Sequence, residues 1–156
     1  MPRNGMPRWR GRLKERAAAV ISRIGTAKSR LRSGRSYRPL VLGYHRVVED
    51  FDEASKSDMP SMLISTAMFE RQLDLIGRRF RFVGIDEIGE SVRNGVPFEK
   101  PVAAVTFDDG YQDVFDNAVP LLKRKGIPAA SFVVTDLIGR SAWQTHDKLY
   151  HLVEKA

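Results

Sequence analysis

The hydrophobic and polar positions after residue 38 alternate between two patterns. Apolar runs of strand length occupy residues 40–45, 80–83, 102–107 and 129–134. After each of these runs, apolar side chains recur at helical spacing, over residues 66–77, 86–94, 113–125 and 143–153. Strand followed by helix, four times in succession, is typical of α/β folds in which helices cover a sheet of parallel strands.

Single residues mark the ends of the first two helices. Phe69, Leu73 and Ile76 share one face of the first helix, which Ser65 or Thr66 can cap. The second helix is expected to have Asp86 as its N-cap and to end at Asn94-Gly95, with Ile88 and Val92 turned inward. Residues 46–65 are polar and irregular, which predicts a surface or active-site loop.

The two later strands are both apolar nearly throughout. Residues 102–107 and 129–134 therefore have the pattern of parallel strands that are buried on both faces. The helix between them contains Pro120, which is expected to kink or disrupt it, and Gly126 is expected just after its last turn.

The charges divide the chain into two parts. Residues 1–38 hold 12 basic residues and a single acid, Glu15, whereas residues 39–156 hold 14 basic and 18 acidic residues. The net charge of +7 is therefore a property of a basic tail, 1–38, and the domain 39–156 is mildly acidic. Such a domain is not expected to bind nucleic acid specifically.

The tail leaves three interpretations open. It is a solvated, disordered extension, a basic amphipathic helix that lies on an anionic membrane surface, or a degenerate export segment. The apolar run Ala17–Ile21 is shorter than the ~7–15 residues of a signal-peptide core. No segment reaches the roughly 20 apolar residues that span a bilayer, so the sequence favours the cytoplasm or a membrane surface.

Candidate chemistry follows the strand 102–107. Asp108, Asp109 and Gly110 stand at the carboxyl end of that strand, where parallel α/β folds place their active sites. On an extended chain, consecutive carboxylates point to opposite sides, so one can bind a cation while the other faces a water bound to that cation. Two adjacent acids also raise each other's pKa unless a cation offsets their repulsion. Because the chain has no cysteine, any such metal must be held by oxygen and imidazole ligands.

Several segments, in the right order, resemble the polysaccharide deacetylases, the NodB-homology domain of carbohydrate esterase family 4. Thr106-Phe107-Asp108-Asp109-Gly110-Tyr111 is similar to the first motif of that family. Further similar segments are Leu42-Gly43-Tyr44-His45-Arg46-Val47, Phe69-Glu70-Arg71-Gln72-Leu73 and Lys125-Gly126-Ile127-Pro128-Ala129. The resemblance covers most of the chain after the tail.

The resemblance implies a fold and a mechanism. The fold would be a distorted (β/α) barrel, and the activity would be removal of acetyl groups from an N-acetylated polysaccharide. Asp108 would be the general base and Asp109 the ligand of a divalent metal, which is usually zinc in the family. His45, at the end of the first strand, and Tyr111 are candidates for binding substrate.

The second metal-binding motif of the family, His-Ser/Thr-x-x-His, is not found. His146 and His151 are separated by four residues, so their side chains differ by ~140° around a helix, and we interpret them as surface or half-buried helix histidines rather than ligands. Residues 39–156 are therefore expected to form the N-terminal half of a deacetylase domain, truncated before that motif and inactive alone.

Two other functions were compared with this one. Phosphatases of the haloacid dehalogenase type also carry acids after an apolar strand, but they need Asp-x-Asp rather than Asp108-Asp109. The other alternative is a non-catalytic fragment, or a module that binds membranes or polyanions through its tail. That alternative shares every residue named above and stays open at the level of sequence.

Overall fold

A computed structural model describes residues 37–140 and 142–154. The expectations for residues 1–36 of the basic tail lie outside the described residues.

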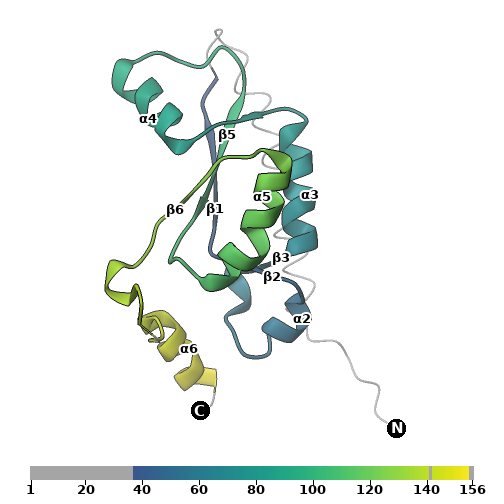
Figure 1. Cartoon of the computed structure of the whole chain (residues 1–156), viewed down its shortest axis with the longest axis vertical. Helices are drawn as coiled ribbons and strands as arrows, with labels where there is room; N and C mark the ends of the chain where they lie inside the picture. Colours follow the sequence, from purple (N-terminus) through teal and green to yellow (C-terminus); the bar gives the residue numbers. More distant parts are fainter. Residues whose placement is uncertain (1–36, 141, 155–156) are drawn as a thin grey trace. The chain divides into compact units, whose positions relative to one another are not determined.

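The main sheet is built around one central strand, β5 (Val102–Phe107). On one side, β1 (Leu40–Tyr44) pairs along its whole length, with Leu40 opposite Ala103 and Tyr44 opposite Phe107. On the other side, β4 (Arg81–Phe82) pairs with the start of β5, and β6 (Ala129–Ser131) pairs with its end. All these ladders are parallel, as the alternation of strands and helices predicted (Figure 1).

The segment 46–65 is more ordered than the expected loop. β2 (Arg46–Val48) and β3 (Leu63–Ser65) pair in parallel as a second, two-stranded sheet. Between them lie the short helix α2 (Phe51–Ala54) and a 3-10 turn, Pro60–Met62. The prediction was wrong here because a three-residue strand is too short to show a period, and burial of Val47 at 0% exposure depends on distant residues.

The first long helix, α3 (Thr66–Gly77), agrees with its sequence pattern. Ser65 caps it, since its side-chain oxygen accepts a hydrogen bond of 3.2 Å from the backbone N–H of Met68. The helix buries Phe69, Leu73 and Ile76, the three residues expected on its inner face.

The second long helix, α4 (Ile85–Asn94), differs from the expectation at two residues. Its N-cap is Gly84, and Asp86 lies inside the first turn, where its charge still favours the positive end of the helix. Ile88 is buried in a small apolar cluster, but Val92, one turn further along, is 73% exposed. Gly95 ends the helix in the left-handed conformation, as expected.

The helix around Pro120 is interrupted, as predicted. Residues Val114–Ala118 form a π-helical turn (η2), and the regular helix α5 (Val119–Lys125) begins after it. Proline has no backbone N–H, so it fits the first turn of a new helix better than the middle of a continuous one. Gly126 follows α5 with φ of 64°.

The strand expected at residues 129–134 is shorter and more exposed than its pattern suggested. β6 ends at Ser131, although the N–H of Phe132 still donates to the carbonyl of Phe107 at 2.8 Å. Phe132 is 56% and Val133 50% exposed. The prediction of a buried strand was wrong because burial depends on cover over both faces of a strand, which the described residues do not supply here.

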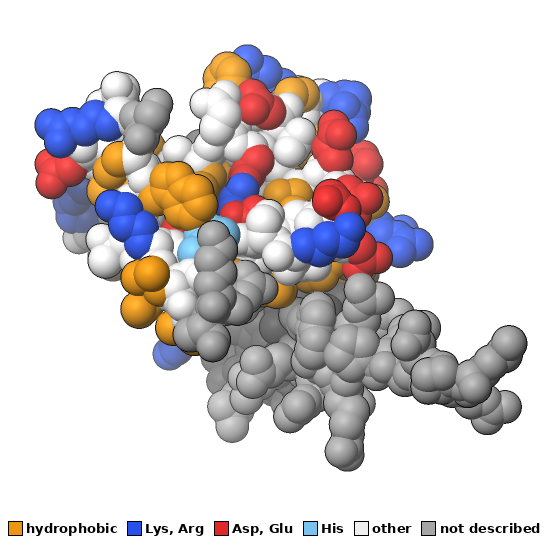
Figure 2. Space-filling model, turned by 90° about the horizontal axis from the view of Figure 1, so that it is seen from below, with side chains coloured by type: hydrophobic (Ala, Val, Ile, Leu, Met, Phe, Trp, Pro, Cys, Tyr) orange, Lys and Arg blue, Asp and Glu red, His pale blue; other side chains and the backbone are white. Residues whose placement is uncertain are grey.

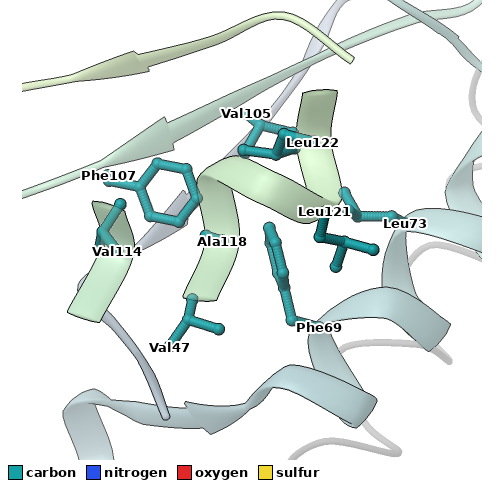
Figure 3. Close-up of a cluster of buried hydrophobic side chains, with 9 residues drawn as sticks. All are labelled: Val47, Phe69, Leu73, Val105, Phe107, Val114, Ala118, Leu121 and Leu122. Atoms are coloured by element: carbon teal, nitrogen blue, oxygen red, sulfur yellow. The ribbon is translucent and has the colours of Figure 1, made fainter. Parts of the chain in front are cut away.

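The main core lies between β5 and the helices α3 and α5 (Figures 1 and 3). Its members come from β2, α3, β5, η2 and α5, and are Val47, Phe69, Leu73, Val105, Phe107, Val114, Ala118, Leu121 and Leu122. The described strands form an open α/β sheet, and this core fixes the end of β5 from which the Asp-Asp-Gly turn emerges. The last helix, α6 (Thr145–Glu154), follows a loop after β6.

Candidate active site

The turn after β5 combines a paired strand end with left-handed backbone. The N–H of Asp108 donates to the carbonyl of Tyr44 at 2.8 Å, which keeps Asp108 in register with β1. Asp109 and Gly110 follow with φ of 72° and 69°. The sequence suggested that the alternation of an extended strand separates the two carboxylates. In the structure, a tight turn separates them instead. A non-glycine residue in this conformation stores strain, and such residues concentrate at functional sites.

Two imidazoles lie next to the carboxylate of Asp109. The Nε2 atoms of His45 and His146 are each 3.9 Å from the same oxygen, Oδ2. That distance is too long for a hydrogen bond, yet short enough for a common ligand to join the groups. His45 follows β1, on the rim of the sheet where the sequence placed it.

His146 is a half-buried helix histidine, which agrees with one of the two alternatives, but the groups around it were not predicted. Its Nε2 atom is 2.8 Å from the hydroxyl of Tyr111 and 3.6 Å from Oδ1 of Asp147. The angular argument itself was sound, since His151 does not share the contacts of His146 and lies against Trp143, with ring centroids 4.5 Å apart and the rings tilted by 57°. The sequence offered no signal for His146, because a loop of irregular structure brings α6 to the end of β5.

Tyr111 connects α6 to the Asp-Asp-Gly turn. Its hydroxyl donates to Oδ2 of Asp147 at 2.9 Å, and the guanidinium carbon of Arg46 lies 4.8 Å from the centre of its ring. Burial raises the pKa of Tyr111, and the hydrogen bond to Asp147 raises it further. Tyr111 is therefore a neutral phenol at physiological pH and can act as a hydrogen-bond donor.

Arg46 ties the turn to the second sheet. Its Nε donates to Oδ2 of Asp113 at 2.7 Å, and its Nη1 lies 2.8 Å from Oδ1 of Asp58. Burial alone lowers the pKa of Arg46, but the hydrogen bonds and charges of these two acids outweigh it and raise the pKa. Burial raises the pKa of Asp113, and Arg46 and the N–H of Val47 offset only part of that effect. The carboxylate of Asp113 would be costly to bury without a cation, so its burial depends on the ion pair with Arg46.

A cavity of about 370 Å³ opens beside Asp109. Arg46, Tyr111, Trp143, Asp147 and His151 contribute to its wall. Its mixture of aromatic and charged groups suits a polar ligand with apolar faces, and its volume is in the range of small-molecule sites. On the face shown in Figure 2, a histidine side chain reaches the surface among hydrophobic and charged side chains.

The donors around Asp109 are of the types that zinc prefers, carboxylate and imidazole. The described residues nevertheless contain no group of three donors arranged to hold an ion. Asp109 with His45 therefore fits part of a zinc site, whereas a catalytic zinc is typically held by about three protein ligands.

Comparisons with known proteins relate this chain to polysaccharide deacetylases. Residues 95–154 match the polysaccharide deacetylase family model. The poly-β-1,6-N-acetyl-D-glucosamine N-deacetylase of Staphylococcus aureus is 27% identical over 118 residues, which are 70% of this chain and 40% of the relative. The enzyme of the same name from Staphylococcus epidermidis is 31% identical over 108 residues, 64% of this chain and 37% of the relative.

A solved structure has the same arrangement of elements. The structure of IcaB from Ammonifex degensii superposes with a TM-score of 0.58 and 27% identity, over 79% of this chain and 51% of that one. The chain thus spans about two fifths of the curated relatives and half of the solved one. No helix in the described part of the chain is long and apolar enough to cross a membrane. The family match, the relatives and the shared fold together show that the chain carries part of a NodB-type polysaccharide deacetylase domain.

Proposed function

We propose that this domain hydrolyses the acetamide C–N bond of an N-acetylated polysaccharide, with Asp108 as general base and Asp109 as a ligand of a divalent metal, zinc in the first instance. The observation that carries this proposal is the Asp108-Asp109 pair at the end of β5, in a chain that matches the deacetylase family. The names of the staphylococcal relatives support a polymer of β-1,6-linked N-acetylglucosamine as the substrate. The open sheet is, on this proposal, part of a distorted (β/α) barrel.

Each side chain of the site has its own role in the proposed reaction. Asp109 and His45 would hold the metal, which when bound lowers the pKa of water and polarises the acetamide carbonyl. Asp108 accepts the proton of the attacking water. The neutral hydroxyl of Tyr111 and the cavity beside it would orient the sugar. His146 contributes by fixing Tyr111, since its Nε2 is within 2.8 Å of that hydroxyl.

Zinc titration of three variants tests the assignment of the two acids. Asp109→Ala should lose zinc binding because it removes a direct ligand, whereas Asp108→Asn should retain it. Asp116→Asn is the matched control, because Asp116 is an exposed acid on the neighbouring π-helical turn, bonded to Gln112. Stoichiometric zinc in Asp109→Ala would contradict the role of Asp109.

Acetate release tests the base. In a polypeptide that spans a whole deacetylase domain, Asp108→Asn should abolish acetate release from an N-acetylglucosamine oligomer, because an amide does not accept a proton. A near-normal kcat in that variant would remove Asp108 from the mechanism. For the 156-residue chain by itself we expect weak zinc binding and no release, because Asp109 and His45 make an incomplete ligand set. Tight zinc with measurable release would instead show that this chain holds a complete site.

A further inference from the structure

Two polar side chains at the start of α6 form hydrogen bonds with the turn after β5. The amide Nε2 of Gln144 donates to the backbone carbonyl of Asp109 at 3.1 Å. The carboxylate of Asp147 accepts a hydrogen bond of 2.9 Å from the hydroxyl of Tyr111. Gln144 and Asp147 are three residues apart, the spacing that places side chains on one side of a helix. The start of α6 is therefore joined to the turn at two points.

The hydrogen bond from Gln144 reaches the peptide unit that joins two left-handed residues. Its acceptor, the carbonyl of Asp109, belongs to the peptide bond between Asp109 and Gly110, and the φ angles of these residues are 72° and 69°. Just before this peptide, the N–H of Asp108 is bonded to the carbonyl of Tyr44 at 2.8 Å. The chain is thus fixed where it leaves the strand, and Gln144 fixes it again in the turn itself.

The conformation of Asp109 requires support of this kind. A left-handed conformation is costly for a residue with a Cβ, and it persists only where the surrounding structure determines it. That cost is similar in size to the net contribution of one hydrogen bond to stability, so a single bond is enough to decide the conformation. The hydrogen bond from Gln144 is partly buried, which strengthens it relative to one in open water.

We propose that Gln144 is a positioning residue for Asp109, because its hydrogen bond keeps the turn left-handed and so directs the Asp109 carboxylate toward His45. In this conformation, Oδ2 of Asp109 lies 3.9 Å from Nε2 of His45. The consequence for metal binding rests on the proposed function. The competing cause is packing of the turn on the segment after β6, since a Cβ on Gly110 would lie 2.9 Å from Cγ1 of Val133.

Nuclear magnetic resonance of the 156-residue chain tests the conformation of Asp109 directly. A residue with left-handed φ brings its own N–H and Hα close together, which gives a strong intraresidue nuclear Overhauser effect. Gln144→Met keeps the length of the side chain but removes the donor, so this signal should weaken at Asp109. Gln144→Lys retains an N–H donor and should preserve the signal. Leu149→Met is the matched control, because Leu149 is 62% exposed on the same helix, and it should leave the signal unchanged.

Zinc titration tests the consequence for the Asp109 carboxylate. Gln144→Met should weaken zinc binding about threefold to tenfold, the range that corresponds to the loss of one net hydrogen bond. Leu149→Met should bind zinc as the unmodified chain does. Both substitutions introduce an uncharged methionine on the same part of the chain, so neither changes the attraction of the site for a cation.

Thermal unfolding shows whether each variant remains folded. If Gln144→Met does not fold, Asp147→Ala carries the test, because loss of its bond to Tyr111 releases the start of α6 and should weaken the same signal. An unchanged signal at Asp109 in Gln144→Met would overturn the proposal and assign the turn to its packing on Val133. A weakened signal with unchanged zinc affinity would overturn the positioning role. An unmodified chain that binds no zinc would contradict the proposed metal site alone, and the signal at Asp109 would still decide whether Gln144 holds the turn.

Discussion

Replacement of Gly110 by alanine should destabilise the domain for two separable reasons. Gly110 has φ of 69°, a conformation that costs an L-residue about 1–2 kcal/mol. A Cβ at this position would also lie 2.9 Å from Cγ1 and 3.2 Å from Cβ of Val133, closer than atoms pack. Val133 is β-branched and stiff, so the overlap must move backbone, and overpacking of this kind costs about 1–3 kcal/mol. The sum is roughly 2–5 kcal/mol.

A second glycine supplies the control. Gly126 has nearly the same φ, 64°, but a Cβ there would meet no atom within 4 Å. Gly126→Ala should therefore cost only the backbone part, about 1–2 kcal/mol. The measurement is guanidinium unfolding, followed by circular dichroism.

The double variant Gly110→Ala, Val133→Ala isolates the overlap. Because Val133→Ala removes the atoms that clash, the two substitutions should couple favourably by about 1 kcal/mol or more. Equal losses for Gly110→Ala and Gly126→Ala, together with additivity in the double variant, would refute the close contact between the Asp-Asp-Gly turn and the segment after β6.

Two further predictions concern the ion pair and the tail. Arg46→Met should cost about 1–3 kcal/mol, because it leaves the Asp113 carboxylate half-buried without its cation. The loss should shrink as the pH falls through the raised pKa of Asp113, since a protonated carboxyl needs no cation; a loss that is constant with pH would contradict this reason. Arg46→Lys should be intermediate, because lysine lacks the planar fork that serves Asp113 and Asp58 together. Deletion of residues 1–36 should leave the unfolding midpoint unchanged, because the tail adds no apolar stripe to the strand-helix alternation, and a large drop would show that the tail packs on the domain.

Local sequence patterns predicted burial correctly where the spacing of the residues along the chain determines it. Phe69, Leu73 and Ile76 had to share a face of α3 because helical spacing places them there, and Ser65 had to cap it because its oxygen reaches the N–H of Met68. β5 was recognised for the same reason, since a strand with five apolar residues out of six requires cover on both faces.

Sequence patterns predicted burial wrongly where burial depends on contacts with distant elements. Residues 129–134 are similar to β5 in apolar composition, yet Phe132 and Val133 are about half-exposed, because the described residues do not cover both faces of this segment. Val92 lies on the inner stripe of α4 by spacing but extends beyond the apolar cluster beneath that helix. The short strands β2 and β3 showed no period, and only their mutual pairing makes them strands.

For the candidate site, the sequence by itself determined the acids and their position at the end of a buried strand. Asp108 and Asp109 follow β5 directly, so the strand pattern and the position of active sites in parallel sheets were enough to single them out. The tertiary structure alone decided which side chains surround them. His146 lies 37 residues after Asp109, and its approach to 3.9 Å depends on a loop whose path no local pattern encodes. The strand pattern predicted extended backbone through both acids, and the left-handed conformation of Asp109, with φ of 72°, was visible only in the structure.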